Sequence, residues 1–100
     1  MVQIKWVKRA LNDLHEIYEF IALDSPKYAQ IQVENIQNSV SYLTEFPAFG
    51  RKMPEFPDLD YREVLVGNYR IIYRVEEKRN QVFILAVVHG RRLLLTPPGN

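Results

Sequence analysis

The dipeptide Gly67-Asn68 separates two strand-like runs of residues, Tyr61–Val66 and Tyr69–Val75. Both residue types accept the positive φ angles that a two-residue hairpin loop requires, so the pattern predicts a β-hairpin. The residues that flank the loop then lie opposite each other, and every later pair along the two strands follows from that first one. A slip of one residue would exchange the two faces of the hairpin, so all predicted faces depend on this loop.

This register divides the hairpin into an apolar face and a polar face. The apolar face is expected to pack on helices and holds Val64, Val66, Tyr69, Ile71, Tyr73 and Val75. The opposite face holds Tyr61, Glu63, Leu65, Arg70, Ile72 and Arg74. We expect Glu63 to lie diagonally between the two arginines, because side chains on one face interact with their cross-strand neighbours. The plainest interpretation of this trio is a surface ion-pair ladder, which contributes little to stability.

A third strand is predicted at Val82–His89, after the polar turn 76–81. Pairing Val75 with Val82 places Val82, Ile84, Ala86 and Val88 in the core, and Phe83, Leu85, Val87 and His89 on the arginine face. A half-solvated antiparallel strand should alternate between apolar and polar residues, but this one is apolar on both faces. We therefore expect a cover over Phe83, Leu85 and Val87. The cover is the tail of the chain with Leu93, Leu94 and Leu95, a second copy, or another protein.

The first half of the chain is predicted to be mainly helical. A short strand at residues 2–7 precedes an amphipathic helix over residues 8–23, and a second helix begins after the N-cap Ser25 and extends to about Glu45. Residues 47–60 hold several prolines and are expected to be an irregular connection. The predicted fold class is α+β: an N-terminal strand, an antiparallel two-helix hairpin, and a three-stranded antiparallel meander in one sheet. Residues 1–100 form a single domain, with a tail from about residue 93.

Composition narrows the function classes. The chain of 100 residues has no cysteine, which suits a reducing compartment, and its longest apolar run has seven residues, well below the about 20 that span a bilayer. A cytoplasmic protein without a metal or another cofactor is expected. Residues 1–50 carry four basic and six acidic groups, net −2, whereas residues 51–100 carry nine and six, net +3. The basic groups of the second half that could bind phosphate or a target are Arg51, Lys52, Arg70, Arg74, Arg91 and Arg92.

Four stretches carry a resemblance to a known family. They are Ala10…Asp13-Leu14…Ile17, Pro47…Gly50-Arg51, Tyr69-Arg70…Tyr73-Arg74-Val75, and Val87-Val88-His89-Gly90-Arg91-Arg92. In this order and spacing, which spans almost the whole chain, they resemble the RelE/ParE superfamily of toxins from bacterial type II toxin–antitoxin modules. The resemblance implies a cognate antitoxin as partner, for which the expected contact is the side of Phe83, Leu85 and Val87. It also leaves a homodimer or a toxin–antitoxin hetero-oligomer open.

Two target classes share this fold, so the site residues must decide between them. RelE-like members cut messenger RNA on the ribosome without a metal, and here Arg70, His89 and Glu63 would be the catalytic candidates. ParE-like members inhibit DNA gyrase by binding, often from plasmid-stabilisation modules. No tyrosine or second histidine follows His89, which favours the ParE-like prediction, with the RelE-like endoribonuclease as the alternative. His89 is otherwise a structural histidine at a strand end, and Arg91-Arg92 otherwise a solvated terminus.

Overall fold

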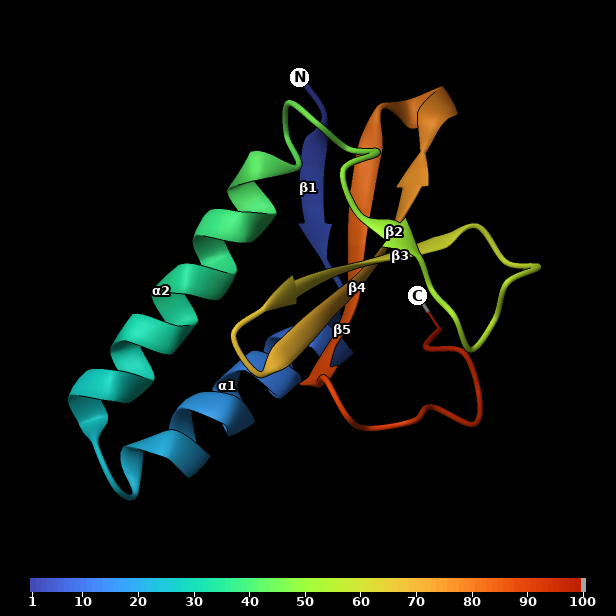
Figure 1. The fold of residues 1–100 in the computed structure, drawn as a ribbon. Coiled ribbons are helices and arrows are strands. Elements are labelled where there is room, and N and C mark those ends of the chain that lie inside the picture. The colour runs from blue at the N-terminus through green and yellow to red at the C-terminus, as the bar shows by residue number, and fades with distance from the viewer. Residues whose placement is uncertain (100) are drawn as a thin grey trace.

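The computed structural model describes residues 1–99 and confirms the α+β class. Five strands form one mixed sheet in the order β1-β5-β4-β3-β2, in which β1 runs parallel to β5 and the other neighbours are antiparallel. Two antiparallel helices cover one face of this sheet (Figure 1). The elements are β1 (Gln3–Trp6), α1 (Lys8–Ala22), α2 (Pro26–Tyr42), β2 (Arg51–Lys52), β3 (Tyr61–Val66), β4 (Tyr69–Glu76), the 3₁₀ turn η1 (Glu77–Arg79) and β5 (Gln81–His89).

The helical hairpin forms as its local signals predict. The Ser25 hydroxyl accepts a hydrogen bond from the Tyr28 backbone N–H at 3.1 Å, and Pro26 occupies the first turn of α2, where its missing N–H costs nothing. Helix α2 ends at Tyr42, earlier than the predicted end near Glu45. The N–H groups of Leu43 and Thr44 bond three residues back, which tightens the last turn and stops the α-helix.

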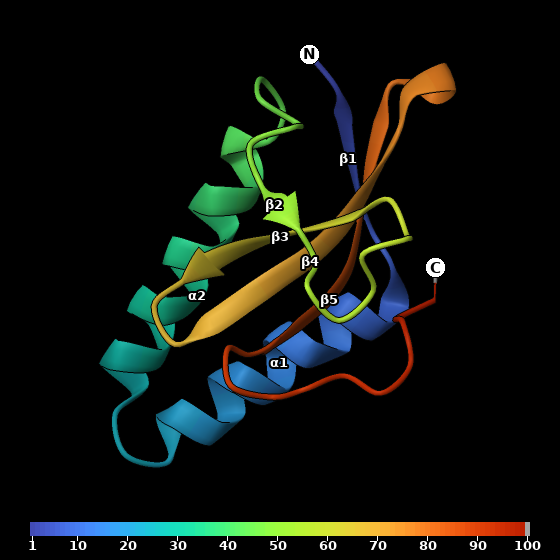
Figure 2. The same cartoon turned by 45° about the vertical axis from the view of Figure 1, so that its right-hand side comes forward.

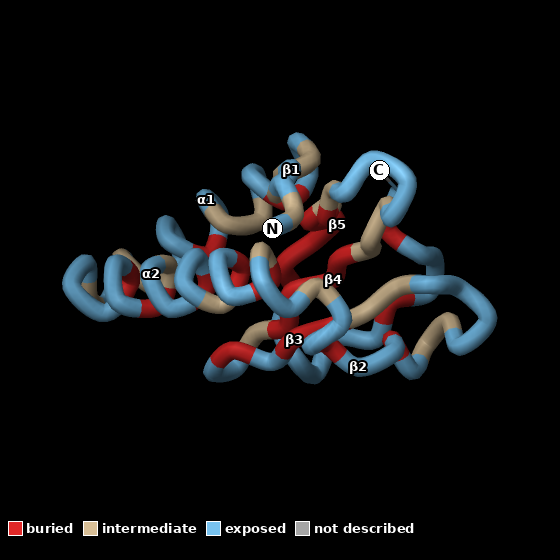
Figure 3. Tube along the Cα trace, turned by 90° about the horizontal axis from the view of Figure 1, so that it is seen from above, coloured by how far each residue is buried: buried red, intermediate tan, exposed pale blue. Residues whose placement is uncertain are grey.

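Apolar residues from both helices and from the central strands form the main core. Figure 3 shows the buried stretches along β4 and β5 and on the sides of the helices that face them. This cluster contains Ala10, Ile17, Ile36, Val40, Leu43, Val64, Val66, Ile71, Tyr73, Val82, Ile84 and Val87. Its members from β3 and β4 are those that the hairpin register predicts. Within residues 1–99, no helix has the length and apolar character needed to cross a membrane.

The register of the β3–β4 hairpin is confirmed. Val66 pairs with Tyr69, Leu65 with Arg70, and Gly67 has φ 58°, a left-handed conformation that costs glycine little. The two faces of this hairpin are therefore the predicted ones.

The connection over residues 47–60 contains one element that the sequence analysis missed. Strand β2 forms the far edge of the sheet, with Arg51 opposite Glu63 and Lys52 opposite Arg62. Two residues are too few to show a period-2 pattern, so only the partner strand reveals this strand.

Gly50, just before β2, packs so closely that a Cβ atom there would lie 2.7 Å from the Tyr73 hydroxyl oxygen. That hydroxyl accepts a hydrogen bond from the Gly50 N–H at 2.8 Å and donates one to the Pro47 carbonyl oxygen at 2.7 Å. Burial also raises the pKa of Tyr73, which keeps the hydroxyl protonated as a donor. Tyr73 thereby ties the start of the connection to the core.

Replacing Tyr73 with phenylalanine should lower the free energy of unfolding by about 1–3 kcal/mol, because the Gly50 N–H and the Pro47 carbonyl lose a buried partner. Chemical denaturation of the two proteins measures this difference. Tyr28→Phe removes a hydroxyl from an exposed side chain and is the matched control, with an expected change below about 0.5 kcal/mol. Equal effects of the two substitutions would show that the Tyr73 bridge does not stabilise the fold.

The predicted faces of β5 are wrong beyond its midpoint. A β-bulge lies between the pairs Tyr73–Ile84 and Ile72–Ala86, so Leu85 has no partner across from it. One extra residue inverts the alternation of every side chain that follows. Val82 and Ile84 therefore lie in the main core as predicted, but so does Val87, while Ala86 and Val88 lie on the opposite face.

The bulge also removes the expected shared face of Phe83, Leu85 and Val87. Leu85 is fully buried and Val87 nearly so, while Phe83 is half-buried under the Arg74 guanidinium, whose carbon lies 4.5 Å from the ring centroid.

The chain itself covers the second face of the sheet. A smaller apolar cluster there joins Met53, Ile72, Ala86, Val88 and Leu94, with Phe56 and Tyr61 packed against it. Met53 and Phe56 come from the connection after β2, and Leu94 comes from the C-terminal tail, which turns back from the end of β5 (Figure 2). Of the three tail leucines expected to form a cover, only Leu94 does so, and it packs with Ile72, Ala86 and Val88 in place of the expected strand residues. The connection that carries Met53 and Phe56 is a second cover, which the sequence did not predict.

Candidate target-binding cleft

An open cleft of about 450 Å³ lies where the β3–β4 turn and the end of β5 meet the tail. It is lined by Arg51, Pro54, Glu55, Glu63, Leu65, Gly67, Asn68, Tyr69, Arg70, His89, Gly90, Arg91, Arg92 and Leu93. The predicted catalytic and phosphate-binding residues therefore gather here, with two exceptions. Lys52 is exposed on β2 outside the cleft lining, and Arg74 lies further along β4, bonded to Glu76 at 3.3 Å.

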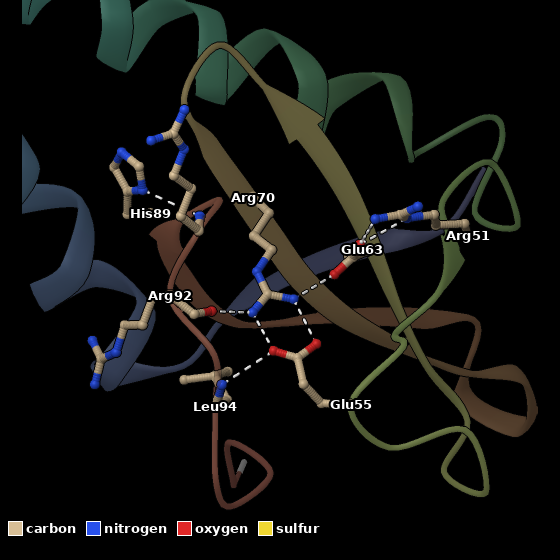
Figure 4. A network of polar contacts seen from close by, with 8 residues as sticks. Arg51, Glu55, Glu63, Arg70, His89, Arg92 and Leu94 are labelled. Atoms are coloured by element: carbon tan, nitrogen blue, oxygen red, sulfur yellow. Dashed lines mark hydrogen bonds and ion pairs between the residues drawn. The ribbon is translucent and has the colours of Figure 1, made fainter.

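Arg70 lies at the centre of a buried ionic network (Figure 4). Its side chain is only 5% exposed. Its Nη1 donates to a Glu55 carboxylate oxygen at 2.8 Å and to Glu63 Oε1 at 2.7 Å, and its Nη2 donates to the other Glu55 oxygen. Nη2 also donates to the backbone carbonyl of Arg92 at 2.5 Å. Both terminal nitrogens of Arg70 are thus bonded to other segments of the protein, whereas its Nε is buried without a hydrogen-bond partner among the described residues. The terminal nitrogens of this guanidinium are therefore not free for a ligand.

Glu63 joins Arg70 to Arg51, not to Arg74 as the sequence analysis expected. Glu63 is 1% exposed, and its Oε2 accepts from Nε and Nη2 of Arg51, each at 2.7 Å. Strand β2 causes this difference, because it places Arg51 directly opposite Glu63. The Glu63–Arg70 pair is thus buried and not part of a surface ion-pair ladder. Removing one partner of a buried pair leaves the other charge unpaired, which is costly.

Glu55 is the site residue that sequence reasoning missed. It comes from the proline-rich connection, and no local pattern distinguishes it from the other acidic residues there. The pKa of Glu55 is lowered from 4.5 to about 2, chiefly by the hydrogen bond from Arg70. Burial opposes this shift, and the Leu94 N–H, which donates to Glu55 at 3.1 Å, adds to it. Two glutamates therefore neutralise Arg51 and Arg70 within the cleft. Among residues 1–99, no ion pair engages Arg91 or Arg92, and both are exposed at the cleft edge.

His89 lies apart from the Arg70–Glu63 pair. It pairs with Tyr69 across the sheet, and the two rings meet edge to face with centroids 5.7 Å apart. Because Tyr69 and Arg70 are adjacent in one strand, their side chains point to opposite faces, and His89 shares the face of Tyr69. The predicted placement of His89 on the arginine face is wrong, and the β5 bulge is the reason. Its Nδ1 accepts a hydrogen bond from the Arg91 N–H at 3.2 Å.

The Glu55–Arg70 contact should make the stability of the fold depend on acidic pH. Because the folded-state pKa of Glu55 is below its value in the unfolded chain, its stabilisation is fully present above about pH 5 and is lost as the pH falls from 4.5 towards 2. A shift of this size corresponds to about 3 kcal/mol. Denaturation at a series of pH values measures the loss, and Glu55→Gln should flatten the profile. An unchanged profile in this variant would exclude Glu55 as the titrating group.

Comparison with known proteins agrees with this fold. A sequence model of the family described as "ParE toxin of type II toxin-antitoxin system, parDE" matches residues 4–94. The chain belongs to the ParE toxin family. Its curated relatives include "Putative toxin Y4kP" of Sinorhizobium fredii, 35% identical over 90% of each chain, and "Toxin RelE2" of Caulobacter vibrioides, 34% identical over 93% of this chain and 100% of that protein.

Solved toxin–antitoxin structures share the fold of this ParE-family toxin. The chromosomal ParDE system of P. aeruginosa superposes with a TM-score of 0.72 at 24% identity, covering 89% of this chain and 96% of that one. The isolated E. coli RelE toxin gives 0.64 at 18% identity, covering 93% and 88%. Both branches of the RelE/ParE fold are therefore similar in backbone to this chain. Within residues 1–99, no group of three or more His, Asp or Glu side chains is placed to hold a metal ion.

Proposed function

We propose that this type II toxin acts by binding a protein target, DNA gyrase, and does not cleave RNA. The observation that carries the proposal is the state of Arg70, which is buried and bonded to Glu55, Glu63 and the Arg92 carbonyl. Metal-free cleavage of RNA needs a cation that stabilises charge on the phosphorane, together with an acid and a base near the reacting atoms. The strand arginine that would supply the cation is occupied by the carboxylates of the chain itself.

The remaining catalytic candidates also fit poorly with cleavage. Glu63 is buried, and its two carboxylate oxygens accept hydrogen bonds from Arg51 and Arg70, so it is poorly placed to take a proton from a ligand. His89 also lines the cleft, but from the face of Tyr69, and one of its ring nitrogens is bonded to the backbone of Arg91. For cleavage, an acid and a base would both have to reach the same bound phosphate, and Glu63 and His89 are not arranged in this way.

The edge of the cleft has the composition of a protein-binding surface. Arg91 and Arg92 are exposed there beside Leu65 and Leu93, whose exposed fractions are 60% and 70%. Arginines beside apolar side chains are typical of the energetic centres of protein interfaces, whereas a phosphate backbone gains little from exposed leucine.

A RelE-like endoribonuclease is the second candidate, favoured by the relative named "Toxin RelE2" and by the basic groups that line the cleft. In that case Arg51, Arg91 and Arg92 would hold RNA phosphates, with His89 as the proton-transfer group.

Two assays on the purified toxin separate these functions. We expect it to block DNA supercoiling by gyrase and to trap cleaved DNA, and to leave messenger RNA intact on translating ribosomes. Cleavage of messenger RNA without an effect on gyrase would overturn the proposal and support the second candidate. His89→Ala then distinguishes the roles of the histidine, because only the endoribonuclease needs it for its chemistry.

A cognate antitoxin is the other proposed partner, since the similar structures include ParDE and RelBE toxin–antitoxin complexes. Of the three residues expected to contact it, Phe83 remains accessible, because Leu85 and Val87 are buried by the chain itself. Both proposed targets are cytoplasmic, so the toxin is proposed to act in the cytoplasm. Co-expression with the small acidic protein expected from a neighbouring reading frame should restore growth, and failure of every neighbouring product to do so would count against the antitoxin.

A further inference from the structure

The segment that carries Arg91 and Arg92 is held in place by hydrogen bonds that begin at the end of β5. The Gly90 N–H donates to the Asn68 carbonyl at 2.7 Å, and the Arg92 N–H donates to the His89 carbonyl at 3.0 Å. These contacts turn the chain away from the sheet. They do not hold it down beyond residue 92.

Two further hydrogen bonds hold the tail beyond residue 92, and both are made with the Glu55–Arg70 ion pair. The Arg92 carbonyl accepts from Arg70, and the Leu94 N–H donates to Glu55 (Figure 4). Arg70 comes from β4 and Glu55 from the connection after β2, so three distant segments meet at one pair of charges. Because both side chains are at most 7% exposed, water competes weakly for these bonds.

The apolar contacts of the tail also indicate that it is attached at Leu94. Leu94 is 8% exposed and packs in the second cluster, whereas its neighbours Leu93 and Leu95 are 70% and 87% exposed. The tail is therefore anchored at residue 94, where the ion pair also binds it. Arg91 and Arg92 lie between this anchor and the end of β5, on a short span that is fixed at both ends.

We propose that Glu55 and Arg70 are positioning residues: their ion pair clamps the tail at Arg92 and Leu94 and so holds the Arg91 and Arg92 side chains in the orientation that contacts the target. The role of these two arginines rests on the proposed function, but the clamp itself does not. Fixing a contact segment in its bound geometry removes ordering cost from binding. Breaking the clamp should therefore weaken the toxin without removing either arginine.

Limited digestion of the full-length toxin with trypsin tests the clamp directly. Trypsin cleaves after Arg91 and Arg92 in the tail, and after Lys78 and Arg79 in the exposed η1 turn at the other end of β5. The measured quantity is the ratio of tail cleavage to turn cleavage, read by intact mass. General destabilisation raises both rates and leaves the ratio unchanged, whereas loss of the clamp raises it. We expect Glu55→Gln to raise the ratio at least about tenfold, because the negative charge is lost and the amide has one acceptor oxygen for the three donors that the two carboxylate oxygens serve.

Glu34→Gln is the matched control, since it makes the same change on an exposed face of α2, away from the tail and the turn. It should leave both the ratio and the growth arrest caused by induced toxin unchanged, while Glu55→Gln should reduce growth arrest. A folded Glu55→Gln variant with the wild-type ratio would overturn the clamp, and a raised ratio with full growth arrest would overturn its positioning role. If Glu55→Gln does not fold, Leu94→Ala loosens the same anchor with the ion pair intact and is judged by the same outcomes. Growth arrest needs no assumption about the target, so a toxin without effect on gyrase would refute the proposed function and leave this test valid.

Discussion

Replacing Arg70 with alanine should lower the free energy of unfolding by about 3–5 kcal/mol, a large part of the stability of a domain this size. The substitution leaves the carboxylates of Glu55 and Glu63 buried and without their shared partner. It also removes the donor to the Arg92 carbonyl. The cost of an uncompensated buried charge exceeds what the lost contacts alone would suggest.

Urea denaturation of the purified variants measures this loss. Arg74→Ala on the same strand is the control: Arg74 pairs with Glu76 at a partly exposed site and lies over Phe83, so its loss should cost about 1 kcal/mol. If Arg70→Ala is as stable as Arg74→Ala, the buried network does not hold the fold together. Because Arg70→Ala is expected to destabilise the protein, loss of toxicity in this variant is no evidence for a catalytic arginine.

Replacing Arg91 and Arg92 together with alanine should reduce inhibition of the target at least about a hundredfold, with the free energy of unfolding unchanged within about 0.5 kcal/mol. Both side chains are exposed at the edge of the cleft, and within residues 1–99 neither takes part in an ion pair. Titration of gyrase inhibition with wild-type and variant toxin measures the first quantity, and denaturation measures the second.

Lys78→Ala with Arg79→Ala is the matched control, because it removes the same charge from an exposed site at the opposite end of the hairpin. This control should inhibit as the wild type does. Equal losses in the two double variants would assign the effect to net charge and not to the cleft. An unfolded Arg91/Arg92 variant would show that these arginines are structural.

Much of the backbone architecture was predictable because its signals are local. The two helices, the Ser25 cap and the Gly67-Asn68 loop each depend on residues a few positions apart, and all are present at or near the expected positions. The buried face of α1 differs from the expected stripe, because Ala10 and Ile17 are buried while Leu11 and Tyr18 are exposed. The α+β class and the family resemblance follow from the order of these elements.

The sequence predicted most of the residues that line the candidate site, but not which of them bind one another. Most of the expected residues do line one cleft, because the hairpin register already places Glu63 near Arg70. The partner that decides the chemistry of Arg70 is Glu55, 15 residues away in an irregular connection, and nothing in its neighbourhood marks it. The single-residue bulge in β5 left no signal either, because every residue from Val82 to Val88 is apolar and either alternation fits the pattern.

The sequence by itself determined the helices and the hairpin register, because period and turn chemistry act over short distances along the chain. The resemblance to a toxin family came separately, from the motifs and their order. Only the tertiary structure decided that Arg70 is engaged by Glu55 and Glu63, that His89 lies on the other face, and that the tail covers the sheet. These features join distant segments, such as Leu94 and Glu55, which are 39 residues apart, and the geometry of packing selects such partners. Arg91 and Arg92 are therefore the exposed charges of the tail at the edge of the cleft. Arg70 is instead a buried residue that binds the tail segment.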